Sequence, residues 1–138
     1  MAQPNFLQMY QDLIASPSIS ATAEHLNLSN RGVIDHLATW AQSLGFECEI
    51  TELELAPGKF NLIAKLGQGE GGLMLAGHTD TVPFDESRWS LDPFKLTLKD
   101  DKLFGLGSID MKGFFAFIFD ALHSIDLSKI LASKWKLP

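Results

Sequence analysis

The sequence has a single cysteine, Cys48, so no internal disulfide bond can form, and this removes the usual mark of a secreted domain. Cys48 lies in a stretch of alternating apolar and polar residues, and we interpret it as a half-buried thiol of a strand. The N-terminus has no basic start or apolar core of a signal peptide, and the longest apolar run, residues 114–119, is too short to span a bilayer. These absences predict a soluble, cytoplasmic protein.

Positive charge is also scarce. Eleven lysines and arginines stand against 17 aspartates and glutamates, which leaves a net charge of −6. Nucleic acid and anionic membranes are bound by a basic face, so neither is expected as a partner. With 138 residues, of which 46% are hydrophobic, the chain is long enough to form one globular domain with a core.

Two apolar stripes at helical spacing predict helices in the first third of the chain. The first helix begins at Pro4 or Asn5 and ends at Ser16, because a proline follows. The second spans residues 30–44 and ends at a glycine. The small, polar residues 18–27 between the two helices are predicted to form a surface loop.

Three strands are expected next. Residues 46–53 alternate as a half-buried strand does, and residues 60–66 form its partner after a Pro-Gly turn. Residues 73–76 are apolar on both faces, which predicts a buried strand in the middle of a covered sheet. A hairpin followed by a central strand indicates a mixed sheet flanked by helices, and the fold class is therefore α/β.

The last third contains a long connection and a helix. Within residues 83–101, Trp89 and Phe94 either serve a neighbouring site or simply cover a sheet edge. Residues 95–98 and 102–106 are predicted to pair as a short hairpin. Residues 111–125 are apolar nearly all round, which predicts a buried helix. After it, residues 134–138 resemble the approach to a further strand.

The candidate chemistry follows the predicted central strand. In an extended chain, His78 and Asp80 point to the same side, and polar residues at the exit of an apolar strand are typical of α/β active sites. Imidazole is a common metal ligand, and a nearby carboxylate often orients it. Asp110 adds a second carboxylate on a glycine-rich loop before the apolar helix. Together these residues suggest a metal site.

From the residues alone, simpler interpretations stay open. His78 can be a hydrogen-bonded histidine at a strand end, and Asp110 can cap the helix that follows it. The remaining histidines, His25, His36 and His123, lie away from strand ends and are interpreted as solvent-facing or capping residues.

The residues around this candidate site also carry a family resemblance. GHTDTVP at residues 77–83 followed by GSIDMKG at residues 107–113 resembles the paired signature of the M20 family of dinuclear zinc amidohydrolases, and the similarity runs over nearly the whole chain. FDESRWSLDPF (residues 84–94) and DMKGFFAF (residues 110–117) are most similar to the members that act on N2-acetylornithine, rather than to the desuccinylases. The resemblance implies the N-terminal part of a zinc-peptidase-like catalytic domain.

The resemblance also implies roles for single residues. His78 would be a zinc ligand, Asp110 would bridge two zinc ions, and Asp80 would be the catalytic residue that holds the imidazole in its ligating tautomer. The peptide bond after Asp110 would be cis. The reaction implied is hydrolysis of acetylornithine to ornithine and acetate in arginine biosynthesis, by a cytoplasmic homodimer. Cobalt suits these ligands about as well as zinc.

The family scheme needs more than residues 1–138 supply. Of five protein ligands, two are present. A glutamate pair, the general base followed by a ligand, is expected just past Pro138, and a later acidic ligand, a C-terminal histidine and the dimerisation domain are also missing. The chain alone is therefore predicted to be inactive and to bind metal weakly. A succinyl-diaminopimelate desuccinylase or related aminoacyl hydrolase, and a non-enzymatic α/β interaction module, are the alternatives.

Overall fold

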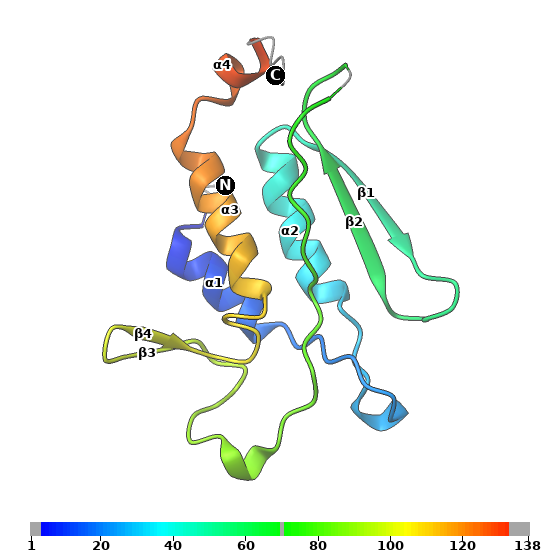
Figure 1. The fold of residues 1–138 in the computed structure, drawn as a ribbon, viewed down its shortest axis with the longest axis vertical. Coiled ribbons are helices and arrows are strands. Elements are labelled where there is room, and N and C mark those ends of the chain that lie inside the picture. Colours follow the sequence, from blue (N-terminus) through cyan, green and yellow to red (C-terminus); the bar gives the residue numbers. More distant parts are fainter. Residues whose placement is uncertain (1–3, 70, 133–138) are drawn as a thin grey trace.

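The computed structural model describes residues 4–69 and 71–132, and it combines helices with small sheets, as the predicted α/β class requires (Figure 1). Within the described residues the elements, in chain order, are α1 (Phe6–Ala15), η1 (Glu24–Leu26), α2 (Arg31–Ser43), β1 (Glu47–Glu52), β2 (Phe60–Lys65), η2 (Glu86–Arg88), β3 (Thr97–Lys99), β4 (Lys102–Phe104), α3 (Lys112–Ser124) and α4 (Leu127–Ala132).

The core lies between α1, α2 and α3, which stand side by side in Figure 1. Helix α1 begins where predicted, because the side chain of Asn5 accepts a hydrogen bond from the backbone N–H of Gln8. The predicted apolar stripes of α1 and α2 meet α3 in one cluster of buried side chains: Met9, Tyr10, Leu13, Ile14, Val33, Leu37, Trp40, Ala41, Ala116 and Phe119. None of the described helices is long and apolar enough to cross a membrane.

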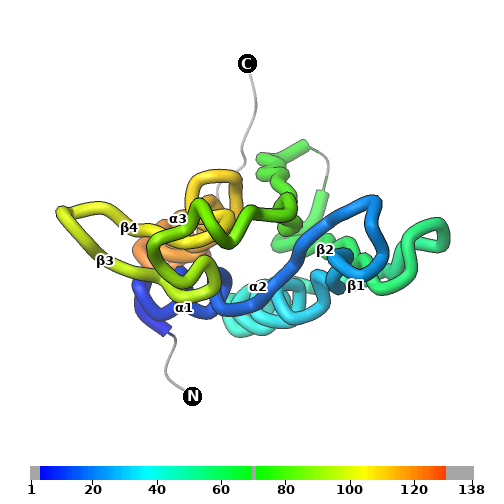
Figure 2. Tube along the Cα trace, turned by 90° about the horizontal axis from the view of Figure 1, so that it is seen from below, coloured from blue at the N-terminus to red at the C-terminus, as the bar shows by residue number. Residues whose placement is uncertain are grey.

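Two antiparallel hairpins flank the helices. Strands β1 and β2 pair with Cys48 opposite Ala64, and the partly buried Cys48 packs against the core, as predicted. Strands β3 and β4 join through a two-residue turn at Asp100 and Asp101, whose φ angles of 51° and 57° suit the primed turns of tight hairpins. Figure 2 places the two hairpins at opposite ends of the molecule, with the helices between them.

The prediction of a central strand at residues 73–76 is wrong. This segment pairs with no described strand, and the side chains of Leu73, Met74 and Leu75 are 87%, 85% and 54% exposed. An apolar run indicates a preference for burial, but a central strand also needs hydrogen-bonded neighbours on both edges. Among the described residues no strand takes either place, so both sheets are two-stranded and antiparallel rather than one mixed sheet.

Two further expectations need correction. Helix α3 is not buried all round, because it packs on one side of the core only and Phe117 is 60% exposed. Residues 18–27 are not simply a surface loop, since Ser18 and Ile19 are buried and Ile19 forms a parallel bridge with Thr81. The strand expected after residue 134 lies outside the described residues.

Helices α1 and α3 approach closely at Gly113. A methyl group there would lie 2.6 Å from Cζ of Tyr10 and would also collide with the carbonyl oxygen of Ser108. We expect Gly113→Ala to lower the free energy of unfolding by about 1–3 kcal/mol, the usual cost of overpacking.

Gly32, the second residue of α2, is the matched control for this prediction. A methyl group there would meet only ordinary contacts, the nearest being Cβ of Ser16 at 3.7 Å. Gly32→Ala should raise the free energy of unfolding by about 0.5–1 kcal/mol through backbone entropy. Urea denaturation followed by circular dichroism measures both variants, and equal effects would contradict the close packing of α1 on α3.

Candidate metal centre

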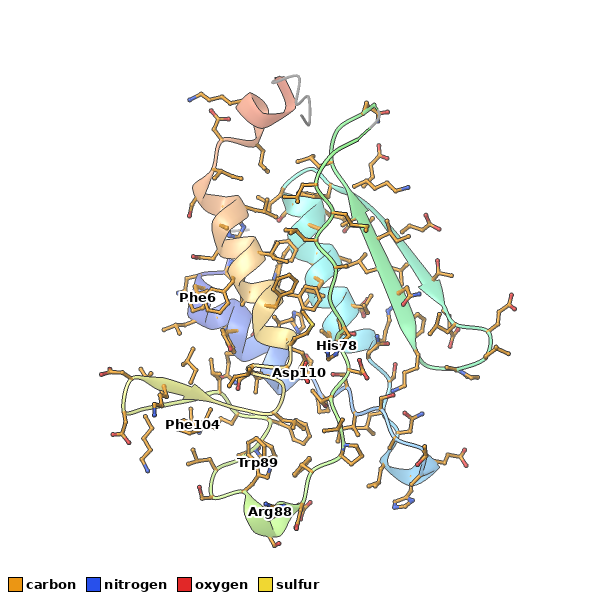
Figure 3. All side chains as sticks on the ribbon, viewed as in Figure 1. Phe6, His78, Arg88, Trp89, Phe104 and Asp110 are labelled. Carbon is orange, nitrogen blue, oxygen red and sulfur yellow. The ribbon has the colours of Figure 1, made fainter. Side chains whose placement is uncertain are left out.

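The centre of the candidate site is the imidazole of His78, which lies between two carboxylates. Its Nε2 is 2.9 Å from Oδ1 of Asp110, and its Nδ1 is 3.1 Å from Oδ1 and 3.2 Å from the backbone oxygen of Asp80. Figure 3 shows His78 and Asp110 meeting from two segments of the chain that are 32 residues apart. The structure thus brings together all three residues that the sequence singles out.

The two carboxylates change the titration of His78. Burial lowers its pKa, but the hydrogen bonds and negative charges of Asp110 and Asp80 raise it by more, so that it lies above the ordinary value of 6.5. When the ring is protonated, Nε2 donates a hydrogen bond to the carboxylate of Asp110, and Nδ1 donates one to the backbone oxygen of Asp80 and faces its carboxylate. The side chains of His78 and Asp110 are 48% and 84% exposed, so solvent and ions reach the pair.

Asp80 and His78 are held in place through the residues next to them. Ser18 donates a hydrogen bond from Oγ to the backbone oxygen of Thr79, at 2.6 Å. Thr81 donates its N–H to the oxygen of Ser18 at 3.1 Å and accepts from the N–H of Ser20 at 2.8 Å. The segment therefore gains its first firm attachment just after His78, beside the polypeptide that follows α1.

Asp110 belongs to a loop that is attached to α1 and to the long connection. The N–H of Leu106 donates to the oxygen of Pro93 at 2.7 Å, and Oη of Tyr10 donates to the oxygen of Ser108 at 2.5 Å. The peptide bond between Asp110 and Met111 is cis, as the resemblance implies. The interpretation of Asp110 as a helix cap is wrong: Met111 occupies the cap position of α3 and no side chain caps that end.

A buried lysine lies directly behind this loop. Lys112 is fully buried, and its Nζ donates to the backbone oxygen of Ser16 at 3.1 Å, at the end of α1. Burial lowers the pKa of Lys112 to about 8. Its side chain also packs against Gly107, where a methyl group would lie 2.9 Å from Cε of Lys112. Lys112 thus ties the loop of Asp110 to the helical core.

An open cavity of about 280 Å³ adjoins the imidazole, and His78, Asp80, Trp89, Leu106 and Asp110 are among the residues that line it. Trp89 also borders a neighbouring cavity of about 330 Å³, in which Phe84 packs edge-on against Trp89 and Phe94. The long connection therefore contributes Trp89 to the candidate site, and its aromatic side chains pack against one another. The described contacts do not place them over a sheet edge.

An imidazole nitrogen and a carboxylate oxygen at this separation are suited to share a divalent cation. Within residues 4–69 and 71–132, however, no group of three or more histidine, cysteine, aspartate or glutamate side chains is arranged to hold a metal ion. The described residues thus offer a pair of candidate ligands with an orienting carboxylate, which is part of a metal site.

Sequence reasoning missed the polar residues that support this pair. Asn30 was expected only at the start of α2, yet its side chain bonds to Phe60 and Thr79 and does not cap the helix. Lys59 donates from Nζ to the backbone oxygens of Ile19 and Leu28, at 2.9 and 2.6 Å. These contacts join residues far apart in sequence and leave no periodic pattern.

Comparison with known proteins finds similar sequences. Residues 74–133 match the family described as peptidase family M20/M25/M40. The chain is 60% identical over 127 residues to acetylornithine deacetylase of Pasteurella multocida, covering 92% of this chain and 33% of that protein. It is 58% identical to the enzyme of the same name from Proteus mirabilis, with the same coverage. The chain spans about a third of the length of these relatives.

A solved structure is similar as well. Human carnosine dipeptidase 1 superposes with a TM-score of 0.71 at 25% sequence identity, over 86% of this chain and 27% of the other. The sequence match and the similar fold both relate the chain to peptidase family M20/M25/M40.

Proposed function

We propose that this chain forms part of the metal site of a hydrolase that cleaves N2-acetylornithine into ornithine and acetate, a step of arginine biosynthesis. The observation that carries the proposal is the 2.9 Å approach of Nε2 of His78 to Oδ1 of Asp110. Relatives named acetylornithine deacetylase, 57–60% identical to the chain, support this substrate. The chain would be the N-terminal part of a catalytic domain, and the whole protein a cytoplasmic homodimer.

The residues present fit a zinc ion as part of its ligand set. Two ligands of a tetrahedral zinc, bound at about 2.0–2.1 Å, lie roughly 3.3 Å apart. The 2.9 Å between Nε2 and Oδ1 is a few tenths of an ångström shorter and lies in the range of a hydrogen bond. Zinc sites hold three or four protein ligands, so further ligands would come from outside the described residues. Cobalt fits the same donors.

In the proposed reaction His78 and Asp110 would hold the metal. A bound metal supplies a Lewis acid that polarises the amide carbonyl and makes water nucleophilic at neutral pH. Asp80 would accept a hydrogen bond from Nδ1–H of His78, which leaves Nε2 unprotonated and available to the metal. Trp89 and Leu106 form the apolar wall of the cavity beside these groups. The general base would lie outside the chain, and we propose that the chain alone is inactive.

Metal binding should depend on pH because a metal and a proton compete for Nε2 of His78. The pKa of His78 is raised, so zinc affinity should be constant above that pKa and fall by about tenfold per pH unit below it. Isothermal titration calorimetry of the chain between pH 5.5 and 8 measures this, and His78→Gln should abolish the dependence. Zinc binding with the same affinity at every pH would contradict a role for this imidazole.

Activity should appear in a protein of the relatives' full length that carries this chain, and not in the chain alone. Asp80→Asn in that protein should lower kcat/KM for N2-acetylornithine by about 10- to 100-fold, the effect of losing a residue that orients a metal ligand. His78→Ala should reduce it to background. The exposed His25 on η1 provides the control, His25→Ala, which should keep full activity.

The same assay run on N-succinyl-diaminopimelate tests the substrate. Faster turnover of the succinyl compound would overturn the acetylornithine assignment, and hydrolysis by the 138-residue chain alone would overturn the incomplete site.

A further inference from the structure

Thr79 lies between His78 and Asp80, and both its backbone oxygen and its hydroxyl oxygen accept hydrogen bonds. Its backbone oxygen accepts from Oγ of Ser18 at 2.6 Å, and its hydroxyl oxygen accepts from Nδ2 of Asn30 at 2.9 Å. The chain just before His78 has no such support, since Leu73, Met74 and Leu75 are exposed and pair with no described strand. The position of His78 therefore depends on the contacts of Thr79 and of the residues that follow it.

Asn30 is anchored so that it can act on Thr79. Its side chain is 6% exposed, and its amide also pairs with the backbone of Phe60 at the start of β2. Nδ2 donates to the oxygen of Phe60 at 2.8 Å, and Oδ1 accepts from its N–H at 2.8 Å. A flipped amide would set a donor against the N–H of Phe60, so the pairing fixes the direction in which the remaining N–H points. That remaining N–H is the one that reaches Thr79.

We propose that Asn30 is a positioning residue of the candidate metal site: through the hydroxyl of Thr79, its amide holds His78 and Asp80 in register with Asp110. This inference rests on the proposed function. The amide of Asn30 connects the start of α2, the start of β2 and the segment of His78. The helical core therefore fixes the position of His78, which lies outside the described strands. A charge is not involved, because all three contacts are between neutral groups.

Thr79→Val separates this role from a structural one. It removes the hydroxyl but keeps the shape of the side chain, and it leaves the pairing of Asn30 with Phe60 intact. Thr79→Ser restores the hydroxyl. The matched control is Thr81→Val, two residues further on, since the buried hydroxyl of Thr81 has no hydrogen-bond partner among the described residues.

The test is a zinc titration of the 138-residue chain, followed by NMR of the imidazole nitrogens of His78, which separates this site from other histidines. Thr79→Val should weaken zinc binding at His78 by about tenfold, the typical effect of losing a partner beyond the ligands. Thr79→Ser and Thr81→Val should bind within about threefold of the unmodified chain. The urea midpoints of Thr79→Val and Thr81→Val should differ less than their zinc affinities.

Three outcomes would overturn the proposal: unchanged zinc binding in Thr79→Val, no recovery in Thr79→Ser, or an equal loss in Thr81→Val. If the unmodified chain binds no zinc at His78, the metal site fails. The metal-free spectra still decide the positioning role, because Thr79→Val should then shift the Nε2 resonance that reports the contact with Asp110. An unchanged resonance would overturn the role of Asn30 independently.

Discussion

Two backbone hydrogen bonds between Thr81 and residues 18–20 form the attachment on which the candidate site depends. Ordering one residue of backbone costs about 1–2 kcal/mol, and the exposed segment before His78 offers little burial to offset it. The bridge, with the hydroxyl of Ser18 and the amide of Asn30, supplies that compensation just after His78. A few buried polar contacts, rather than a sheet, therefore fix the position of this imidazole.

The electrostatics of the site follow from that position. His78 stands between Asp80 and Asp110, and a protonated ring satisfies both carboxylates at once. A divalent cation satisfies the same carboxylate of Asp110 from the same direction, so proton and cation are alternatives at one place. Asp80 lies beside Nδ1, the other ring nitrogen. Its negative charge stabilises positive charge at Nε2, whether a proton or a cation carries that charge. In the proposed metal site, the geometry that raises the pKa of His78 would also favour a cation at Nε2.

Local sequence patterns predicted the helices and the turn that are determined by residues close together in the sequence. The helical spacing of apolar residues placed α1 and α2, and Asp100 with Asp101 form the tight turn expected between β3 and β4. The central strand at residues 73–76 failed because apolar composition does not specify a pairing partner. Asn30 was recognised only as a helix start, since its contacts reach 30 and 49 residues along the chain.

The candidate site was predictable for a different reason. From local chemistry alone, Asp110 was interpreted as a helix cap. The paired motif of the family related Asp110 to His78 instead, and the 2.9 Å contact between the two side chains agrees with that relation. The sequence pattern predicted that Asp80 lies on the same side of the chain as His78. No strand forms there, but side chains alternate along an extended backbone with or without a paired strand.

An enzyme and an interaction module make different demands on this surface. Exposed Leu73, Met74 and Leu75 suit either one, since exposed apolar side chains are typical of surfaces that another protein or another part of the same protein covers. The convergence of His78, Asp80 and Asp110 favours an enzyme, because a docking surface does not require an imidazole aligned between two carboxylates. Because the incomplete ligand pair and the uncovered apolar segment adjoin along one stretch of chain, a single covering element could complete both.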